Sequence, residues 1–226
     1  MNGQPGERSD TGTLVTDFDG TLTQHDFFRL ALERLVPTDV LDYWKEYRAG
    51  RLTHFEAMRL YYTAIQTSEA ETLAIIAALN LTPDLAVWVN RLKWAGWKVV
   101  VASAGCEWYI RHLLQQQEVY LEVYANPGRF VEGQGLVMEL PVDSPFFSPT
   151  HGIDKAAIVR AAQRSGGRVA FAGDGFPDAP AARLVTPELR FATASLAITL
   201  EQEGLSFRRF DRWAEVAQAL VNRTAV

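Results

Sequence analysis

The chain has 226 residues, of which 48% are hydrophobic and 22% are charged, and its formal net charge is -5 at pH 7. These proportions are typical of a globular protein with one sizeable domain, alone or with a smaller inserted one, and they exclude a disordered or low-complexity chain. The acidic balance argues against a broad nucleic-acid-binding surface, and the single cysteine, Cys106, excludes an internal disulfide bond.

The first 13 residues are rich in glycine, proline and acidic side chains. They lack the apolar stretch of a secretory signal, so we expect a flexible leader over residues 1–13 in a cytoplasmic protein. Purely apolar runs extend over only a few residues, far fewer than the roughly 20 that a membrane-spanning helix needs, which predicts no membrane association. The sequence is compatible with a monomer or a homodimer.

Short apolar runs, rich in β-branched or aromatic residues, predict buried strands over residues 14–18, 98–102 and 168–172. Weaker strand patterns cover residues 190–193 and 207–210. Helical patterns separate or follow the strands, over residues 83–95, 154–163, 195–203 and 211–221. Strands that alternate with helices predict an α/β fold, in which a doubly wound parallel sheet is covered by helices on both faces.

The stretch after the first strand is different, because it contains four helical patterns and no strand pattern. Two of these helices begin with capping boxes, Thr53 with Glu56 and Ser68 with Glu71. We therefore predict a helical-bundle cap domain over residues 25–81, inserted into a core domain formed by residues 14–24 and 82–226. Turn residues at 126–128 and 133–135 predict a β-hairpin excursion within residues 119–140.

Polar side chains follow the predicted strands at the points where the strands end. In an open parallel sheet, ligands bind beyond the carboxyl ends of the strands, so side chains from remote parts of the chain are expected to meet there. A lysine near the start of the helix over residues 154–163 adds a positive charge. The side chains expected at this rim are Asp17, Asp19, Ser103, Lys155, Asp174 and Asp178.

Four carboxylates and one ammonium group at one rim would carry a net charge of three negative, which a bound cation would stabilise. The candidate ligands are oxygen atoms and the four histidines are scattered along the chain, so Mg²⁺ is favoured over Zn²⁺. Mg²⁺ that shares its ligands between carboxylates and a substrate phosphate is typical of phosphoryl transfer. An aspartate can then attack phosphorus and form an aspartyl-phosphate.

Four motifs together resemble those of the haloacid dehalogenase-like (HAD) phosphatases. They are DFDGTLT at residues 17–23, Ser103 after an apolar strand, Lys155 in GIDKAAIV, and GDGFPD at residues 173–178. The resemblance implies a Rossmann-like core in which Asp17 is the nucleophile. It also implies that Asp19 is the general acid and base and ligates the metal through its backbone carbonyl. Gly20 and Thr21 would lie at the phosphate, with Thr21 orienting the first aspartate pair.

The same resemblance assigns roles to the later motifs. Ser103 would hydrogen-bond the phosphoryl group, with Ala104 beside it, and Lys155 would neutralise the phosphate and the nucleophile. Asp174 would ligate Mg²⁺, and Asp178 would support it directly or through water. The metal-binding set implied by the family is thus Asp17, Asp19, Asp174 and Asp178.

An all-helical insert between the first two strands resembles the phosphoserine-phosphatase-like branch of this superfamily. Within that branch, phosphoserine phosphatases carry a glutamate where this chain has Asp26, and a cap arginine for which Arg51 and Arg59 are the candidates. Asp26 is read equally as a helix cap and as a substrate contact. The sequence TLTQHD and residues 190–213 look more like the methionine-salvage 2-hydroxy-3-keto-5-methylthiopentenyl-1-phosphate phosphatases. The partner expected in either case is a small phosphorylated metabolite.

Two other functions use the same residue types. A phosphotransferase would pass the phosphoryl group to an alcohol instead of water. A signalling module phosphorylated on aspartate also gathers aspartates, a hydroxyl and a lysine at an α/β rim, but receiver domains are about half this length and lack an inserted cap.

Overall fold

The computed structural model describes residues 12–223. The leader expected over residues 1–13 lies outside this range up to residue 11, whereas Gly12 and Thr13 already belong to the first strand. Among the described residues, no helix has both the length and the apolar composition to cross a membrane.

A parallel sheet of six strands forms the centre of the described chain, in the order β10-β9-β8-β1-β2-β3. The central strands are buried on both faces, which explains their nearly continuous apolar sequences. The strand order reverses at β1, so the crevice at its carboxyl end is where ligands bind in such folds. The strand bounds are β1 Gly12–Thr16, β2 Trp97–Cys106, β3 Glu122–Asn126, β8 Arg168–Gly173, β9 Arg190–Ala192 and β10 Arg208–Arg209.

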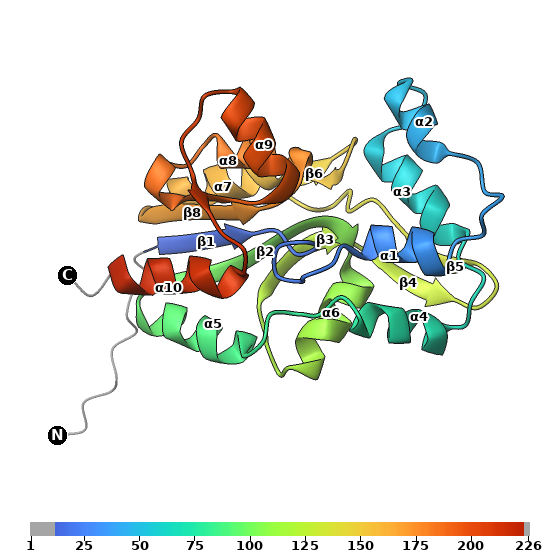
Figure 1. Cartoon of the computed structure of the whole chain (residues 1–226), viewed down its shortest axis with the longest axis horizontal. Helices are drawn as coiled ribbons and strands as arrows, with labels where there is room; N and C mark the ends of the chain where they lie inside the picture. Colours follow the sequence, from blue (N-terminus) through green and yellow to red (C-terminus); the bar gives the residue numbers. More distant parts are fainter. Residues whose placement is uncertain (1–11, 224–226) are drawn as a thin grey trace.

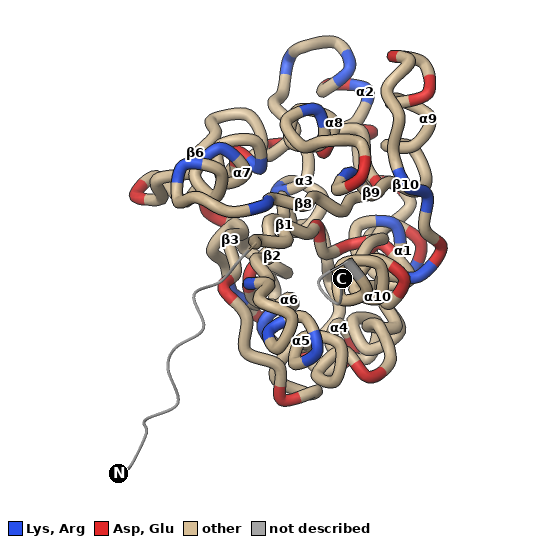
Figure 2. The backbone as a smooth tube through the Cα atoms, turned by 90° about the vertical axis from the view of Figure 1, so that its left-hand side faces the viewer, with Lys and Arg blue, Asp and Glu red and all other residues tan. Residues whose placement is uncertain are grey.

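Helices cover both faces of the sheet, as Figures 1 and 2 show, which confirms the predicted doubly wound α/β fold. One layer contains α5 Leu85–Trp94, α6 Glu107–Gln116 and α10 Trp213–Arg223. The other contains α7 Lys155–Arg164, α8 Ala179–Ala182 and α9 Ala194–Gln202, with the 3-10 turns η1 Phe176–Asp178 and η2 Pro187–Leu189.

Four helices occupy residues 27–77 and lie at the end of the sheet to which the β1 arrow points in Figure 1. Both predicted capping boxes are present, at Thr53 and at Ser68. Thr23 and Leu81 form an isolated antiparallel bridge, so the two segments that connect these helices to the sheet lie side by side. The bounds are α1 Phe27–Arg34, α2 Tyr43–Arg48, α3 His54–Thr63 and α4 Glu69–Ala77.

The four helices and the sheet share one continuous hydrophobic cluster. It contains Leu14 and Val101 from the sheet as well as Phe27 and Tyr62 from the helical segment. The ring of Phe27 lies 4.6 Å from that of Tyr109 on α6, measured between centroids. The helical segment therefore packs directly on the sheet layer at the end where the strand termini meet.

The hairpin expected within residues 119–140 is only partly correct. Its first half, β3, joins the main sheet in parallel to β2. The hairpin itself consists of β4 Gly128–Val131 and β5 Gly135–Met138, and β5 packs against α3. A second short ribbon pairs β6 Phe147–Ser148 with β7 Gly152–Ile153 and leads into α7. The alternating pattern of residues 119–140 does not show whether a strand pairs with the main sheet, as β3 does, or within a hairpin, as β4 and β5 do.

Candidate active site

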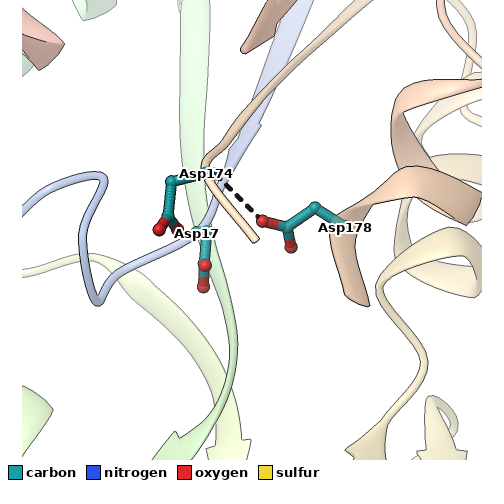
Figure 3. A group of neighbouring side chains, drawn as sticks. All are labelled: Asp17, Asp174 and Asp178. Atoms are coloured by element: carbon teal, nitrogen blue, oxygen red, sulfur yellow. Dashed lines mark hydrogen bonds between the residues drawn. The ribbon is translucent and has the colours of Figure 1, made fainter. Parts of the chain in front are cut away.

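Three carboxylates from two strand ends converge at the point where the strand order reverses. Asp17 follows β1 and its backbone N–H donates to the carbonyl of Ala172 over 2.8 Å, which ties the ends of β1 and β8 together. Asp174 directly follows β8, and Asp178 lies one turn later in η1. One carboxylate oxygen from each of Asp17, Asp174 and Asp178 lies within 4.8 Å of the others. Figure 3 shows the three side chains.

Lys155, the first residue of α7, links two of these carboxylates. Its ammonium nitrogen lies 2.7 Å from Asp17 Oδ1 and 2.6 Å from Asp178 Oδ1, and all three side chains are buried. The second oxygen of Asp178 accepts from the backbone N–H groups of Asp174 and Gly175. Asp178 therefore fixes both the lysine and the loop that carries Asp174.

Burial and the charges of neighbouring carboxylates raise the pKa values of Asp17 and Asp174. Burial, followed by the charge of Asp178, raises the pKa of Asp17 to about 7. Burial, followed by the charges of Asp17 and Asp178, raises the pKa of Asp174 to about 9. Burial opposes the charged form of Lys155, but its ion pairs with the two carboxylates raise the pKa of the amine above its usual value. The cluster is thus short of positive charge, as a cation site is before it binds its ion.

The turn after β1 is shaped to let Asp174 approach. Gly20 has a φ of +71°, and a Cβ atom there would lie 2.5 Å from Asp174 Oδ2. The hydroxyl of Thr21 donates to Asp174 Oδ1 over 3.3 Å. Thr21 was expected to orient the first aspartate pair, but its hydroxyl bonds to Asp174, which follows the neighbouring strand β8.

Asp19 is held apart from the three clustered carboxylates. Its Oδ2 accepts from the hydroxyl of Tyr109 over 2.5 Å, and its Oδ1 accepts from the backbone N–H of Phe27 over 3.1 Å. Burial, followed by the charge of Asp26, raises the pKa of Asp19 to about 8. Three of the four predicted metal ligands bring their side chains into one group, whereas the Asp19 side chain is directed to other partners. Asp19 was expected to ligate the metal through its backbone carbonyl, and the partners of its side chain are compatible with that role.

The end of β2 supplies the hydroxyl of the site. Ser103 is buried, and its Oγ accepts from the backbone N–H of Gly105 over 2.9 Å. The side-chain amide of Asn126, at the end of β3, donates to the carbonyl of Ala104 over 2.7 Å. Asn126 thus holds the irregular part of β2 that carries the serine. It was not predicted, because its position depends on β3 joining the main sheet.

A cavity of about 280 Å³ lies above these groups, between the strand ends and the helical segment. Asp26 and Arg29 from the start of α1 line it, and Asp26 also caps α1 by accepting from the backbone N–H of Arg29. The two expected cap arginines lie elsewhere, since Arg51 pairs with Glu46 and Arg59 stacks on Phe55. Of the predicted residues, those that line the cavity are Asp17, Asp19, Asp26, Ser103, Ala104, Lys155, Asp174 and Asp178. Gly20 lines the adjoining cavity.

The sequence profile of the haloacid dehalogenase-like hydrolases matches residues 14–183, a range that contains the whole carboxylate cluster, Lys155 and Ser103. The chain belongs to this family. Among curated protein sequences, the comparison found no match.

Solved structures with the same fold include members of the HAD family. A HAD family hydrolase from Salmonella enterica serovar Typhi is 17% identical with a TM-score of 0.68, over 96% of this chain and 74% of that one. A phosphoserine phosphatase from T. onnurineus is 18% identical with a TM-score of 0.63, over 98% and 99%. A phospho-aspartyl intermediate analogue of phosphoserine phosphatase is 17% identical with a TM-score of 0.62, over 93% and 99%. At these identities the likeness establishes a shared fold.

This HAD-like hydrolase also contains a histidine pair that the sequence did not suggest. The rings of His54, at the start of α3, and His151, before α7, lie 5.0 Å apart between centroids. His54 lines the cavity beside Trp44 and Phe176. The two histidines are almost a hundred residues apart in sequence, and no motif connects them. The sequence therefore could not predict this contact.

Divalent cations are expected to stabilise this HAD-like hydrolase, because they would relieve repulsion within the cluster of Asp17, Asp174 and Asp178. Mg²⁺ at about 100 times its dissociation constant would add about 2.7 kcal/mol to the free energy of unfolding. For a domain of this size, that corresponds to a rise of roughly 5–10 °C in the melting temperature. The measurement is thermal unfolding with Mg²⁺, with EDTA, and with potassium chloride at matched ionic strength. An equal melting temperature in all three conditions would contradict a specific Mg²⁺ site.

Replacing Gly20 with alanine is expected to destabilise the protein and to abolish the Mg²⁺-dependent rise in melting temperature. The matched control is Gly50→Ala, because Gly50 has the same φ of +71° but would place its Cβ in open space. Both variants should lose about 1–2 kcal/mol from the left-handed backbone. Only the Gly20 variant should displace Asp174. A normal Mg²⁺ response in that variant would show that the close approach of Asp174 to Gly20 is not needed for Mg²⁺ binding.

Proposed function

We propose that this hydrolase is a Mg²⁺-dependent phosphatase that cleaves the phosphate monoester of a small metabolite through an aspartyl-phosphate intermediate. One observation carries the proposal: Asp17 is buried at the strand switch point, 2.7 Å from the ammonium of Lys155 and grouped with two further carboxylates. A relative of the same fold has been studied as a phospho-aspartyl intermediate analogue, which supports the assignment of a carboxylate nucleophile.

Asp17, Asp174 and Asp178 are the residues that would hold the metal, because they are the group whose carboxylate oxygens converge. A bound Mg²⁺ would neutralise negative charge on the phosphoryl group and on the carboxylates. Lys155 supplies a second positive charge next to Asp17, and this charge favours the ionised nucleophile and offsets its repulsion from the phosphate. Ser103 lies on the same cavity, as expected of a group that hydrogen-bonds the phosphoryl oxygens.

In the first step, an oxygen of Asp17 attacks phosphorus and the bond between phosphorus and the alcohol oxygen breaks. Asp19 gives its proton to the departing alcohol. With a pKa raised to about 8, the Asp19 carboxyl retains this proton at neutral pH, as a general acid must. In the second step, Asp19 takes a proton from water as the water attacks phosphorus, which releases phosphate and restores Asp17.

We further propose that the helices of residues 25–81 act as a cap that selects the leaving alcohol. Phe28, Trp44 and Met58 give the cavity an apolar wall, which favours an ester with an apolar body such as the methylthiopentenyl phosphate of methionine salvage. Phosphoserine is the second candidate, because Asp26 and Arg29 line the same cavity with opposite charges.

A phosphate-release screen tests these proposals with Mg²⁺ and the full chain. The panel includes the methylthiopentenyl ester, O-phospho-L-serine and phenyl phosphate. Release from any of them that EDTA abolishes and Mg²⁺ restores is the expected result. Release only when a second alcohol is supplied would instead indicate a phosphotransferase. A phospho-enzyme that persists for hours without turnover would indicate a signalling module.

A further inference from the structure

Behind the proposed general acid lies a tyrosine that no motif of the sequence indicated. Tyr109 on α6 is fully buried, and its hydroxyl donates to Asp19 Oδ2 over 2.5 Å. Asp19 is only partly buried and lines the cavity, whereas Tyr109 is not among the residues that line it. Tyr109 therefore acts on a bound substrate through Asp19 and not by direct contact.

The other oxygen of the same carboxyl group is held as well. Asp19 Oδ1 accepts from the backbone N–H of Phe27, the first residue of α1, over 3.1 Å. The ring of Tyr109 packs near those of Phe27 and Phe18, at 4.6 Å and 6.2 Å between centroids. Because each oxygen of Asp19 has a donor and the tyrosine ring is held by its neighbours, the plane of the carboxyl group is fixed.

Gly105, at the end of β2, makes room for this tyrosine. A Cβ atom at residue 105 would overlap the Tyr109 hydroxyl and would lie 3.0 Å from Asp19 Oδ2. Gly105 is not among the glycines with a positive φ, so its backbone conformation does not require glycine. What requires glycine at this position is therefore the close approach of the Tyr109 hydroxyl to Asp19.

The chemistry of a general acid explains what this hydrogen bond can do. As the bond between phosphorus and the alcohol oxygen breaks, Asp19 gives its proton to that oxygen and becomes a carboxylate. A hydroxyl donates a stronger hydrogen bond to a carboxylate than to a neutral carboxyl group, so the bond from Tyr109 strengthens as the proton leaves. A contact that strengthens in this way lowers the barrier for alcohols that need the proton.

Resting on the proposed phosphatase function, we propose that Tyr109 is a positioning residue for the general acid Asp19 and that Gly105 is the residue that admits it. Together they orient Asp19 for the protonation of alcohols that leave poorly, so the pair supports hydrolysis of esters of unactivated alcohols. A tyrosine that served only the packing of α6 would not distinguish one leaving group from another.

Two esters that share an aromatic ring test this inference: phenyl phosphate, whose phenol leaves poorly, and p-nitrophenyl phosphate, whose alcohol leaves without a proton. Tyr109→Phe should lower kcat/KM for phenyl phosphate roughly tenfold, the scale of one hydrogen bond to a charged group. It should change kcat/KM for p-nitrophenyl phosphate less than about twofold, because kcat/KM reports the transition state of the first step.

Gly105→Ala should reproduce this selective loss, because the new methyl group would displace the Tyr109 hydroxyl. In the Tyr109→Phe background the same substitution should add less than about a twofold loss, since the hydroxyl is already absent. Losses that simply multiply in the double variant would contradict the proposed link between the two residues.

The matched control is Tyr61→Phe, because the Tyr61 hydroxyl also donates to an aspartate, Asp42, but outside the cavity. It should match the wild type with both esters. Circular dichroism checks folding, and Tyr109→Phe removes one oxygen only, so it keeps the test valid if the Gly105 variant unfolds. Equal losses with both esters in Tyr109→Phe, or no loss with either, would overturn the inference. Absence of phosphate release from both esters in the wild type would instead overturn the proposed function.

Discussion

Replacing Asp17 with asparagine is expected to reduce phosphate release by at least about a thousandfold, because an amide is a very poor nucleophile toward phosphorus. The shape of the side chain is preserved, so the cavity should keep its form. The change also removes one of the two carboxylates that neutralise Lys155. The measurement is steady-state release from phenyl phosphate, together with acid-quench trapping of radiolabelled phospho-enzyme, which should be absent in this variant.

Asp42→Asn is the matched control for this substitution. Asp42 is an exposed helix cap of α2, a role that asparagine fills equally well, and it lies outside the cavity. Its turnover should match that of the wild type. Retained turnover or a labelled phospho-enzyme in the Asp17→Asn variant would refute the assignment of the nucleophile.

Replacing Asp19 with asparagine is expected to slow hydrolysis of alkyl phosphates roughly a hundredfold to ten-thousandfold, because a poor leaving group needs the proton that Asp19 carries. The effect should depend on the leaving group. With p-nitrophenyl phosphate, whose alcohol leaves without a proton, the first step should continue while water activation fails. Rapid mixing should then show a burst of one nitrophenolate per enzyme followed by slow turnover.

Asp84→Asn controls for the loss of a carboxylate, because asparagine suits the left-handed φ of +55° at that position. It should behave as the wild type with both esters. Undiminished single-turnover and steady-state rates in the Asp19→Asn variant would show that another group moves the proton. The hydrogen bond from the Tyr109 hydroxyl holds the Asp19 carboxyl group in a defined position.

The sequence predicted those parts of the site that depend on strand ends. Asp17, Ser103 and Asp174 each follow an apolar run, and parallel pairing of β1 with β2 and β8 brings these ends together. Lys155 was predicted next to a helix start and is the first residue of α7. Such residues can be located without coordinates, because an open parallel sheet has one ligand-binding edge.

Other contacts depend on how the helices pack, which periodicity does not determine. Tyr109 is one of seven tyrosines, and its approach to Asp19 depends on how α6 lies against α1. Arg51, between α2 and α3, and Arg59, on α3, do not line the cavity, whereas Arg29 on α1 does. The helix after residue 82 begins at Leu85 and not at Pro83, because Asp84 adopts a left-handed conformation.

The hydrophobic cluster shared by the helical segment and the sheet limits how such an enzyme can be re-engineered. Phe27 and Tyr62 on one side pack with Tyr109 on the other, so a chimera carrying the helices of a relative would place a foreign surface on this contact. Changes of leaving-group preference are therefore better sought through single substitutions at Phe28 or Met58, which line the cavity, than through grafting of the whole segment.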